Sequence, residues 1–305
     1  MLGSRSSIQM SQYPVTWVGR EVAAYEVSMR ILITVKTYPI PSAKYDELVC
    51  TAGVVESGEF VRLYPINFRD LPYTQQYKKY QWIEVDVKRH EGSDVRKESY
   101  RPDCDTLKVI GEPIQTKNGD WSARAGFVLK CRSRSLEDLR TKQEEDRTSL
   151  GIFRPKKIDD LLIKSDSPEW KASFKAAMCQ ARLWDDRSVS KQPPRKVPFK
   201  FQYCFTCDDS RCQGHQMMIE DWEVGALFWR LRDKGVSPDE AAKGVREKFL
   251  SELCGPKRDT HFYVGTVSAH PTSWVVIGVF YPARSAPSLF DEILKNSPYR
   301  ELFSL

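Results

Sequence analysis

The strongest fold signal in the N-terminal half of the chain is the segment Glu47-Leu-Val-Cys-Thr-Ala-Gly-Val-Val-Glu-Ser-Gly-Glu-Phe-Val-Arg-Leu63. Two runs rich in apolar and β-branched residues flank Glu56-Ser-Gly58, a composition typical of a tight turn. The pattern therefore predicts two strands, at 47–54 and 59–63, that pair as a hairpin.

Further strands are predicted on either side of this hairpin. Before it, Ile31–Lys36 is a β-branched run that ends at Thr37-Tyr-Pro-Ile-Pro41, whose prolines exclude a central strand. After it, Gln81–Lys88 alternates apolar and polar side chains, as a half-buried strand does. A short helix at 67–79 lies between them, and 109–132 adds strand and turn. Several short strands with one helix between them predict a small β-barrel of the OB or SH3-like type.

Capping signals place the helices of the C-terminal half. Ser135 begins one helix with Asp138 three residues later, and Ser237 begins another with Pro238 at its first position. The expected elements are helices at 135–147, 216–234 and 237–255, followed by paired strands at 261–267 and 274–281. The chain is therefore expected to be α+β, with an N-terminal OB/SH3-like barrel, then a zinc-clamped helical pair and a β-hairpin.

Composition divides the chain into parts. Met29 precedes the first strong strand and is an alternative start of translation, and Ser188–Pro198 is rich in Ser, Lys, Gln and Pro, as linkers are. The expected parts are a flexible leader (1–28), the barrel (29–132), a polar helical connection with a linker (133–198), the zinc loop with the helical hairpin and β-hairpin (199–284), and a tail (285–305).

A loop rich in cysteine, Cys204-Phe-Thr-Cys207-Asp-Asp-Ser-Arg-Cys212-Gln-Gly-His215, is the most specific motif of the chain. Its spacing lets one short loop present three sulfurs and an imidazole to a tetrahedral ion. If Cys204 lies on a strand instead, the other three ligands leave one position open. The motif predicts a structural Zn²⁺ site, closed to substrate, with the ligands Cys204, Cys207, Cys212 and His215.

Composition also limits the class of protein. The chain has 305 residues, a net charge of +6, 41% hydrophobic residues and eight cysteines. Cysteines at this density exclude a disulfide scaffold, and no run of about 18 apolar residues marks a membrane span. We expect a cytoplasmic protein with no membrane partner, and the basic balance favours a polyanion.

Basic side chains lie beside aromatic ones at several points. Barrels that bind single strands combine cationic grooves with stacking aromatics, because phosphates and base faces require both. Strand alternation places Val61 and Leu63 on one face and Arg62 on the other. If the first face is core, Arg62 is exposed between Phe60 and Tyr64; if not, it is buried and needs a carboxylate partner. The residues predicted to bind nucleic acid are Phe60, Arg62, Tyr64, Arg69, Arg154 and Lys156.

Three segments carry a resemblance: Lys36-Thr-Tyr-Pro-Ile-Pro-Ser42, Cys50-Thr-Ala-Gly53 and Phe60-Val-Arg-Leu-Tyr-Pro65. Together with the block from Phe205 to His215, they resemble an uncharacterised bacterial family. They are also loosely similar to the dual OB-like modules found beside bacterial defence and mobile-element genes. The resemblance covers 30–130 most clearly, and it implies an OB-like barrel and, by analogy of fold, nucleic-acid binding.

These observations favour a nucleic-acid-binding protein with a structural zinc site, within a bacterial defence or mobile-element system, with DNA and RNA both open. A metal-dependent nuclease is one alternative, in which His215, Asp221 and Glu223 hold a divalent ion. The dipole of a helix N-terminus also accounts for the acidic residues there without any ligand. A protein-binding adaptor is the other alternative. No residue is predicted to be catalytic.

Overall fold

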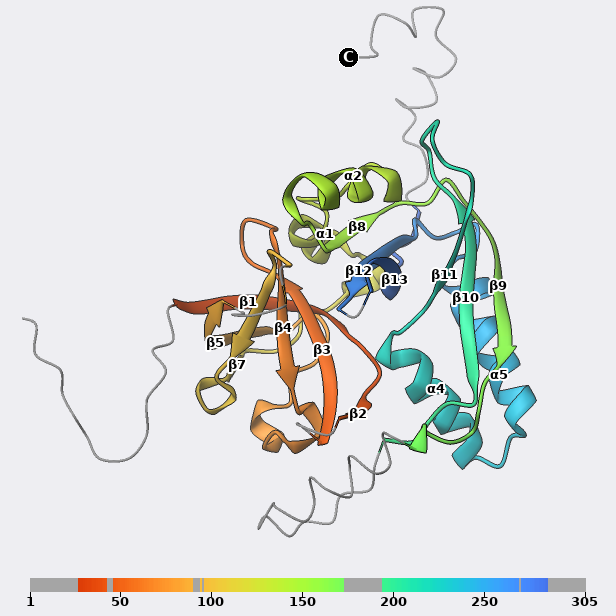
Figure 1. Ribbon diagram of the computed structural model, residues 1–305, viewed down its shortest axis with the longest axis horizontal. Helices are drawn as coiled ribbons and strands as arrows, with labels where there is room; N and C mark the ends of the chain where they lie inside the picture. The colour runs from red at the N-terminus through yellow and green to blue at the C-terminus, as the bar shows by residue number, and fades with distance from the viewer. Residues whose placement is uncertain are drawn as a thin grey trace, which may run out of the picture.

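Runs of β-branched residues form the strands of an N-terminal barrel, barrel 1, as the sequence predicts (Figure 1). Strand β1 pairs with both β3 and β5, so the sheet closes in the order β1-β3-β4-β6-β5. β4 and β6 run parallel, and the other neighbours run antiparallel. This is the strand order of an OB-type barrel, which confirms the expected fold. The strands are β1 (Val27–Lys36), β3 (Asp46–Val54), β4 (Phe60–Ile66), β5 (Trp82–Arg89) and β6 (Ser99–Pro102).

The computed structural model describes residues 27–42, 46–89, 94, 96–172, 194–268 and 270–284. The expected leader up to residue 26, most of the expected linker and the expected tail lie outside these residues. Two short strands, β2 (Ile40–Ser42) and β7 (Lys108–Ile110), extend barrel 1 by pairing with β3 and β5.

Barrel 1 differs from the expected pattern after Asn67. The single helix expected there is two 3-10 turns, Phe68–Asp70 and Tyr73–Gln75. Pro72 separates the turns, and Leu71 before it is extended, with φ of −61° and ψ of 141°. The ring of a proline disfavours the helical conformation of the preceding residue. One proline therefore divides the expected helix.

Two helices follow barrel 1. α1 (Ser122–Val128) lies in a segment that was expected to be strand and turn. α2 (Leu136–Asp146) begins as predicted, since the Ser135 hydroxyl accepts the N–H of Asp138 at 3.0 Å. α2 is polar overall, yet Glu137 in its first turn is buried. A buried carboxylate on a polar helix requires a partner.

A second barrel, barrel 2, contains the remaining strands. Its two three-stranded sheets, β11-β10-β9 and β13-β12-β8, are joined by a parallel bridge between Ile219 and Val276. β8 pairs with β12 and β9 with β10, as the two halves of β1 pair with β5 and β3. If β8 and β9 are counted as one interrupted strand, the strands of barrel 2 follow the same order around the barrel as those of barrel 1. The strands are β8 (Leu150–Phe153), β9 (Lys157–Ser165), β10 (Phe199–Thr206), β11 (His215–Met218), β12 (His261–Val267) and β13 (His270–Phe280).

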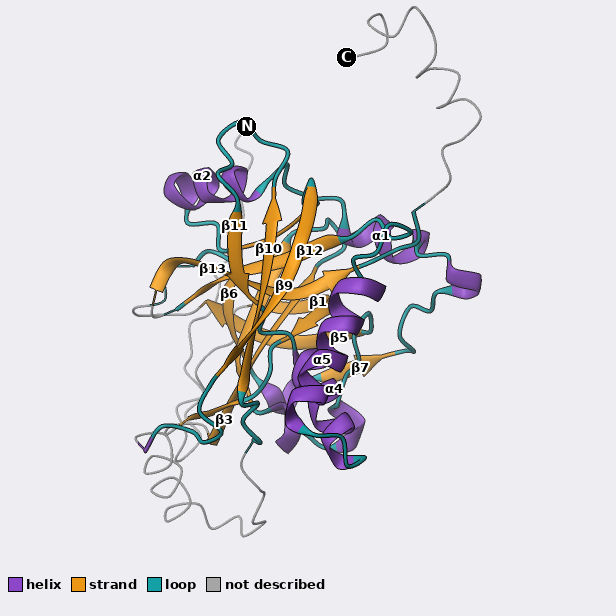
Figure 2. Cartoon of the chain, turned by 90° about the vertical axis from the view of Figure 1, so that its right-hand side faces the viewer, coloured by secondary structure: helices purple, strands orange, loops and turns teal. Residues whose placement is uncertain are grey.

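The predicted helical pair and closing hairpin are present in barrel 2. α4 (Trp222–Asp233) and α5 (Pro238–Arg246) follow β11 and precede β12 in the chain and pack against each other (Figure 2), and Ser237 caps α5 as predicted. The first helix begins six residues later than expected, because 216–218 continues strand β11. β8 and β9 lie in the segment expected to be a polar connection, so that segment supplies part of barrel 2. No described helix is both long enough and apolar enough to cross a membrane.

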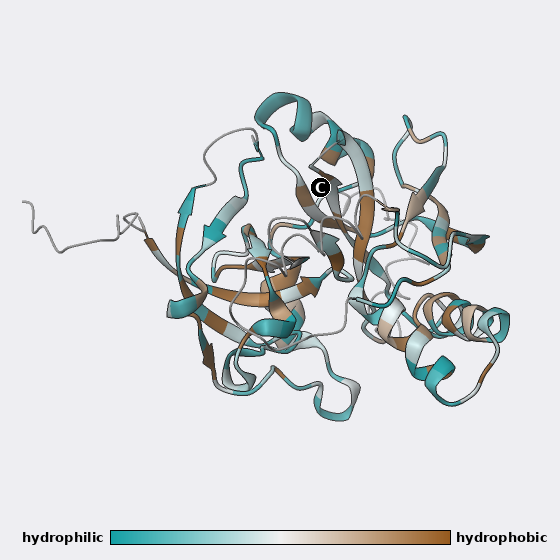
Figure 3. Ribbon diagram, turned by 60° about the horizontal axis from the view of Figure 1, so that its bottom comes forward, coloured by the Kyte–Doolittle hydropathy of each residue, from teal (hydrophilic) through white to brown (hydrophobic). Residues whose placement is uncertain are grey.

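The two barrels pack against each other through the outer faces of their sheets. Each barrel has its own hydrophobic interior, and Figure 3 shows hydrophobic segments along the strands, hydrophilic turns, and helices that carry both kinds of residue. A third buried cluster joins β1 and β3 to β8, β12 and β13. It includes Val35, Ala52, Leu150, Tyr263 and Ile277. The outer face of β3 and β4, a common ligand surface in OB barrels, is therefore covered by barrel 2.

Candidate metal centre

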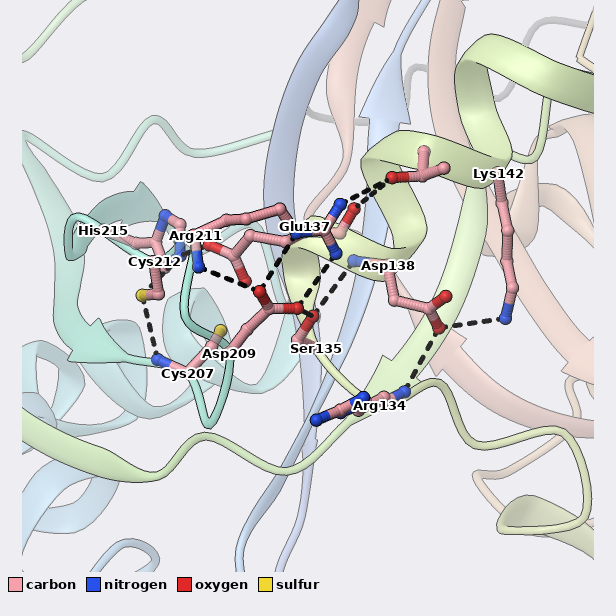
Figure 4. A network of polar contacts seen from close by, with 11 residues as sticks. Arg134, Ser135, Glu137, Asp138, Lys142, Cys207, Asp209, Arg211, Cys212 and His215 are labelled. Carbon is pink, nitrogen blue, oxygen red and sulfur yellow. Dashed lines mark hydrogen bonds and ion pairs between the residues drawn. The ribbon is translucent and has the colours of Figure 1, made fainter.

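The loop between β10 and β11 carries three of the predicted ligands. Cys207 follows β10, Cys212 lies in the loop and His215 begins β11. Glu137 of α2 completes the group, because one ligand atom from each of the four residues lies within 4.8 Å of the others. Figure 4 shows the four side chains converging from the loop and from α2. A cation bound by these residues, the metal centre, would join the β10–β11 hairpin to α2.

Strand alternation points the ligands toward one another. Phe205 is buried on β10 and lies opposite His215 on β11, so both side chains face the interior of barrel 2. Cys207, two residues beyond Phe205, continues the same face and is buried. Gly214 has a φ of +86°, which lets the chain turn back into β11 without strain from a Cβ atom.

Polar contacts hold the loop against α2. Asp209 accepts a hydrogen bond from the Ser135 hydroxyl at 2.8 Å and one from the Arg211 guanidinium at 2.9 Å. Because the Arg211 side chain donates to it, the pKa of the Asp209 carboxyl lies well below its usual value. Ser135 is also the N-cap of α2, so one residue orients both the loop and the helix that presents Glu137.

Cys204 lies outside the metal centre, which corrects the predicted ligand set. It is on β10 between Tyr203 and Phe205, whose side chains are buried in barrel 2. Neighbouring residues of a strand face opposite sides, so the Cys204 thiol faces away from the other ligands. Glu137 takes its place and was missed from the sequence. Its only local signal is an acidic residue after a strong N-cap, which the helix dipole explains equally well.

The polar atoms of the metal centre lie close to one another. Both carboxylate oxygens of Glu137 are buried, and their polar neighbours among the described residues are the His215 ring and the Cys207 thiol, both potential metal ligands. His215 Nε2 lies 2.7 Å from Glu137 Oε1 and 3.3 Å from Cys212 Sγ. Cys212 Sγ also accepts the backbone N–H groups of Cys207 at 3.1 Å and Gly214 at 3.4 Å. Two backbone N–H groups therefore point at the Cys212 sulfur, which faces the other three side chains.

The donor set fits a zinc ion. Burial raises the pKa of Cys207, with the Glu137 carboxylate adding to the effect, and burial lowers the pKa of His215 against the attraction of Glu137. When the two cysteines bind a metal as thiolates, they and the nearby carboxylate all carry negative charge. A dication would balance this charge. Zinc bonds of about 2.0–2.3 Å place tetrahedral ligand atoms about 3.3–3.8 Å apart. With four protein ligands, the ion would be structural and have no position for substrate.

Arg62 is buried, so the exposed strip expected on β4 is wrong at its centre. Only 1% of its surface is exposed, and its neighbours on the other face of β4 are also buried. Its guanidinium donates to Ser149 Oγ at 2.7 Å, Ser149 O at 3.0 Å and Ser99 Oγ at 3.2 Å. The Ser149 hydroxyl in turn donates to Glu98 at 2.7 Å. The arginine thus reaches a buried carboxylate through a serine of barrel 2, and burial lowers its pKa.

The other residues predicted to bind nucleic acid are divided between the barrels. Phe60 and Tyr64 are half-buried on barrel 1, where the Phe60 ring packs 6.5 Å from that of Tyr263. Each of the three cations has an acidic partner within ion-pair distance. The pairs are Arg69 with Glu47 (2.6 Å), Arg154 with Asp259 (2.7 Å) and Lys156 with Asp208 (3.3 Å).

The alternative set of His215, Asp221 and Glu223 does not converge. His215 begins β11, whereas Asp221 lies beyond its end as the N-cap of α4 and accepts the N–H of Glu223 at 2.9 Å. A strand of four residues spans about 13 Å at about 3.3 Å per residue, too far for shared ligation of one ion. Asp221 and Glu223 instead share the ammonium of Lys79, at 3.6 and 3.4 Å.

The buried Asp221 carboxyl predicts a pH dependence of stability. Burial raises its pKa from 3.8 to about 6, against the attraction of Lys79. The folded state therefore holds a proton that the unfolded state has lost, so this contribution is complete below about pH 4 and is lost as the pH rises through about 6. Between about pH 4 and 7, wild type should lose free energy of unfolding relative to Asp221→Asn. Urea unfolding measures this, and a difference that stays constant with pH would contradict it.

Comparisons with known proteins identify two families. The family described as "Domain of unknown function (DUF8757)" matches residues 132–294, and "Domain of unknown function (DUF8758)" matches residues 27–130. No curated protein matches the chain. A murine DNA-binding protein bound with double-stranded DNA is similar at 9% identity and a TM-score of 0.27, covering 86% of this chain and 98% of that one. A replication protein A heterotrimer bound to single-stranded DNA is similar at 8% identity and a TM-score of 0.21, covering 84% and 65%.

Proposed function

Since the chain belongs to the family described as "Domain of unknown function (DUF8757)", which assigns no activity, we propose from its geometry that it binds nucleic acid. Barrel 2 provides the contact surface, and the metal centre holds a structural zinc ion that shapes it. The single observation that carries this proposal is the exposed, lysine-bearing outer face of β9, β10 and β11.

Strand alternation creates this face. Phe201 and Tyr203 point into barrel 2, so the residues beside them on β10 point outward. Lys200 on β10 lies directly opposite Lys164 on β9, and both are exposed. Like charges opposite each other destabilise a sheet, and a phosphate group near both ammonium groups would relieve the repulsion. The surface, termed the lysine face, consists of Lys164, Lys200, Gln202 and Gln216.

The position of the face distinguishes barrel 2 from barrel 1. In barrel 1 the corresponding strands, β3 and β4, contact barrel 2, and Arg62 there is buried. In barrel 2 the strands that contact barrel 1 are β8, β12 and β13, whereas β9 and β10 lie on the side away from it (Figure 1). Among the described residues, barrel 2 is therefore the barrel that keeps this OB ligand surface open.

The side chains of the lysine face suit a polyanion with little sequence selection. Lysines contact phosphates as point charges. The acidic residues nearest this face already have cationic partners: Asp166 lies 3.7 Å from Lys200, and Asp160 pairs with Arg246 at 2.6 Å. Gln202 and Gln216 are joined by a 2.6 Å hydrogen bond and offer amide groups to bases or sugars. Zinc supports the face because it ties down the loop that connects β10 to β11.

DNA and RNA both meet this chemistry. The resemblance of segments in 36–65 to dual OB-like modules beside bacterial defence and mobile-element genes supports a cytoplasmic role in such a system. That setting is part of the proposal, as is the assignment of zinc to the metal centre.

The double variant Lys164→Glu with Lys200→Glu is expected to weaken binding of a single strand of about 20 nucleotides at least about tenfold, because two phosphate contacts become repulsions. Fluorescence anisotropy measures the affinity over a range of salt concentrations. The slope of log K against log salt should fall in magnitude by about 1.4, or about 0.7 for each lost contact.

The matched control is Lys108→Glu with Lys117→Glu, which makes the same change of charge at exposed lysines near barrel 1. This control is expected to retain most of the affinity. Equal weakening by both double variants would show that net charge alone acts, and the lysine face would not be the site. Wild type that binds no strand even at low salt would overturn the proposed function and favour the protein-binding adaptor.

A further inference from the structure

A polar cleft of about 190 Å³ lies where four distant segments of the chain meet. Barrel 1 contributes the residues just before β5, α1 contributes one side chain, α4 one, and the segment after β13 one. The lining residues are Lys79, Tyr80, Arg124, Glu223 and Tyr281. We propose that this cleft binds the guanine base of an unpaired nucleotide, an inference that rests on the proposed function and adds base selectivity to it.

The carboxylate of Glu223 is the recognition group on one side of the cleft. Its side chain is 48% exposed, whereas that of Asp221 is 3% exposed. Lys79 lies near both carboxylates, at 3.4 and 3.6 Å, and Lys36 lies close enough for its charge to interact with both. Two lysines thus balance two carboxylates. Lys79 keeps the buried Asp221 as a partner when Glu223 accepts hydrogen bonds from a ligand, so no buried charge is left unpaired.

Arg124 supplies donors held in a fixed plane. Its guanidinium carbon lies 4.1 Å from the ring centroid of Tyr80 and 4.9 Å from that of Trp121. Its Nε donates to the carbonyl of Ile114 at 2.8 Å, and its Nη atoms have no hydrogen-bond partner among the described residues. Trp121 also packs 4.8 Å from Tyr281, which holds one aromatic wall of the cleft in place.

These groups match the Watson–Crick edge of guanine. That edge presents two adjacent N–H donors, which a carboxylate accepts together, beside the O6 acceptor, which takes a hydrogen bond from a guanidinium or ammonium group. Adenine presents a ring-nitrogen acceptor where guanine presents N1–H, so Glu223 would repel it. The partly exposed ring of Tyr281 offers a flat surface for stacking, as pockets for unstacked bases commonly do, whereas Tyr80 is buried and supports Arg124 from below. The cleft is smaller than a site for a drug-sized ligand, and this favours the base as the recognised part.

Isothermal titration of the full chain with GMP and with AMP tests this inference. Wild type should bind GMP at least about tenfold more tightly than AMP. Glu223→Gln should reduce the affinity for GMP to that for AMP, and Arg124→Lys should weaken GMP binding while it retains the charge. The control Glu252→Gln changes an exposed acid that pairs with Lys248 elsewhere on the chain, and it should leave GMP binding unchanged.

Equal affinity for GMP and AMP, no binding of GMP, or undiminished preference in Glu223→Gln would each overturn the guanine site. An oligonucleotide of about 20 cytosines separates this result from the proposed function, since it reaches the lysine face without offering guanine. If the cytosine strand binds but the protein does not prefer GMP over AMP, only the guanine site is refuted. Binding of GMP with no binding of any strand keeps the cleft and overturns the proposed function.

Discussion

Cys212→Ser is expected to abolish zinc binding and to unfold barrel 2 under conditions in which wild type is folded. Cys212 is one of two thiols in the metal centre, and an ion bound there would join the β10–β11 hairpin to α2. Structural zinc contributes directly to folding free energy, so the loss should exceed about 4 kcal/mol. Elemental analysis measures the zinc content, and circular dichroism during heating, with and without a chelator, measures the stability.

Cys204→Ser is the matched control, because it changes a cysteine of the same motif that lies outside the metal centre. We expect it to retain its zinc and to stay within about 0.5 kcal/mol of wild type. Glu137→Gln should bind zinc more weakly, since a neutral amide replaces a charged ligand. Loss of zinc from Cys204→Ser but not from Glu137→Gln would restore the ligand set predicted from the sequence. Chelation that abolishes a turnover in a protein that remains folded would refute the structural role.

Arg62→Ala is expected to lower the free energy of unfolding by about 3–5 kcal/mol, the usual cost of removing one member of a buried charge pair. Arg62 is fully enclosed between the barrels, and its hydrogen bonds to Ser149 link it to the buried Glu98. The truncation leaves that carboxylate without its cation and leaves a cavity where the barrels meet. Unfolding in urea, followed by circular dichroism, measures the loss.

Two comparisons isolate the cause of this effect. Arg154→Ala removes an arginine whose ion pair with Asp259 is half exposed, and it should cost less than about 1 kcal/mol. Arg62→Met combined with Glu98→Met removes both buried charges, and it should recover much of the stability lost in Arg62→Ala. If Arg62→Ala costs no more than Arg154→Ala, the guanidinium is solvated, as the strip predicted from the sequence requires.

Local sequence signals predicted much of the secondary structure. The turn at 56–58 and the β-branched runs around it predict a hairpin without information from the rest of the chain, because strand preference and turn geometry depend on neighbouring residues. Ser135 and Ser237 cap their helices as predicted, since a cap needs only the next three residues. Three ligands of the metal centre were also predicted, because one short loop contains them.

The second barrel could not be predicted in the same way. Its first strand is interrupted between β8 and β9, and a parallel bridge between Ile219 and Val276 joins its two sheets. Both features depend on segments that are far apart in the sequence. Many different apolar residues can form the inward face of a strand, so equivalent strands of the two barrels need not have similar sequences. The two barrels therefore have the same strand order without a visible repeat in the sequence.

Local signals predicted strands β1, β3, β4 and β5 of barrel 1, the helix caps and the cysteine–histidine loop, because each depends on interactions within a few residues. Strand β6, which closes barrel 1, was not predicted. Contacts between distant segments were needed to show that Glu137, and not Cys204, lies beside Cys207, Cys212 and His215, that Arg62 is buried, and that barrel 2 leaves its β9–β10 face exposed. Strand alternation shows which residues share a face, but which face is buried depends on the element packed against it. Contacts between the two barrels decide which face of a strand is buried, and the local sequence pattern does not specify these contacts.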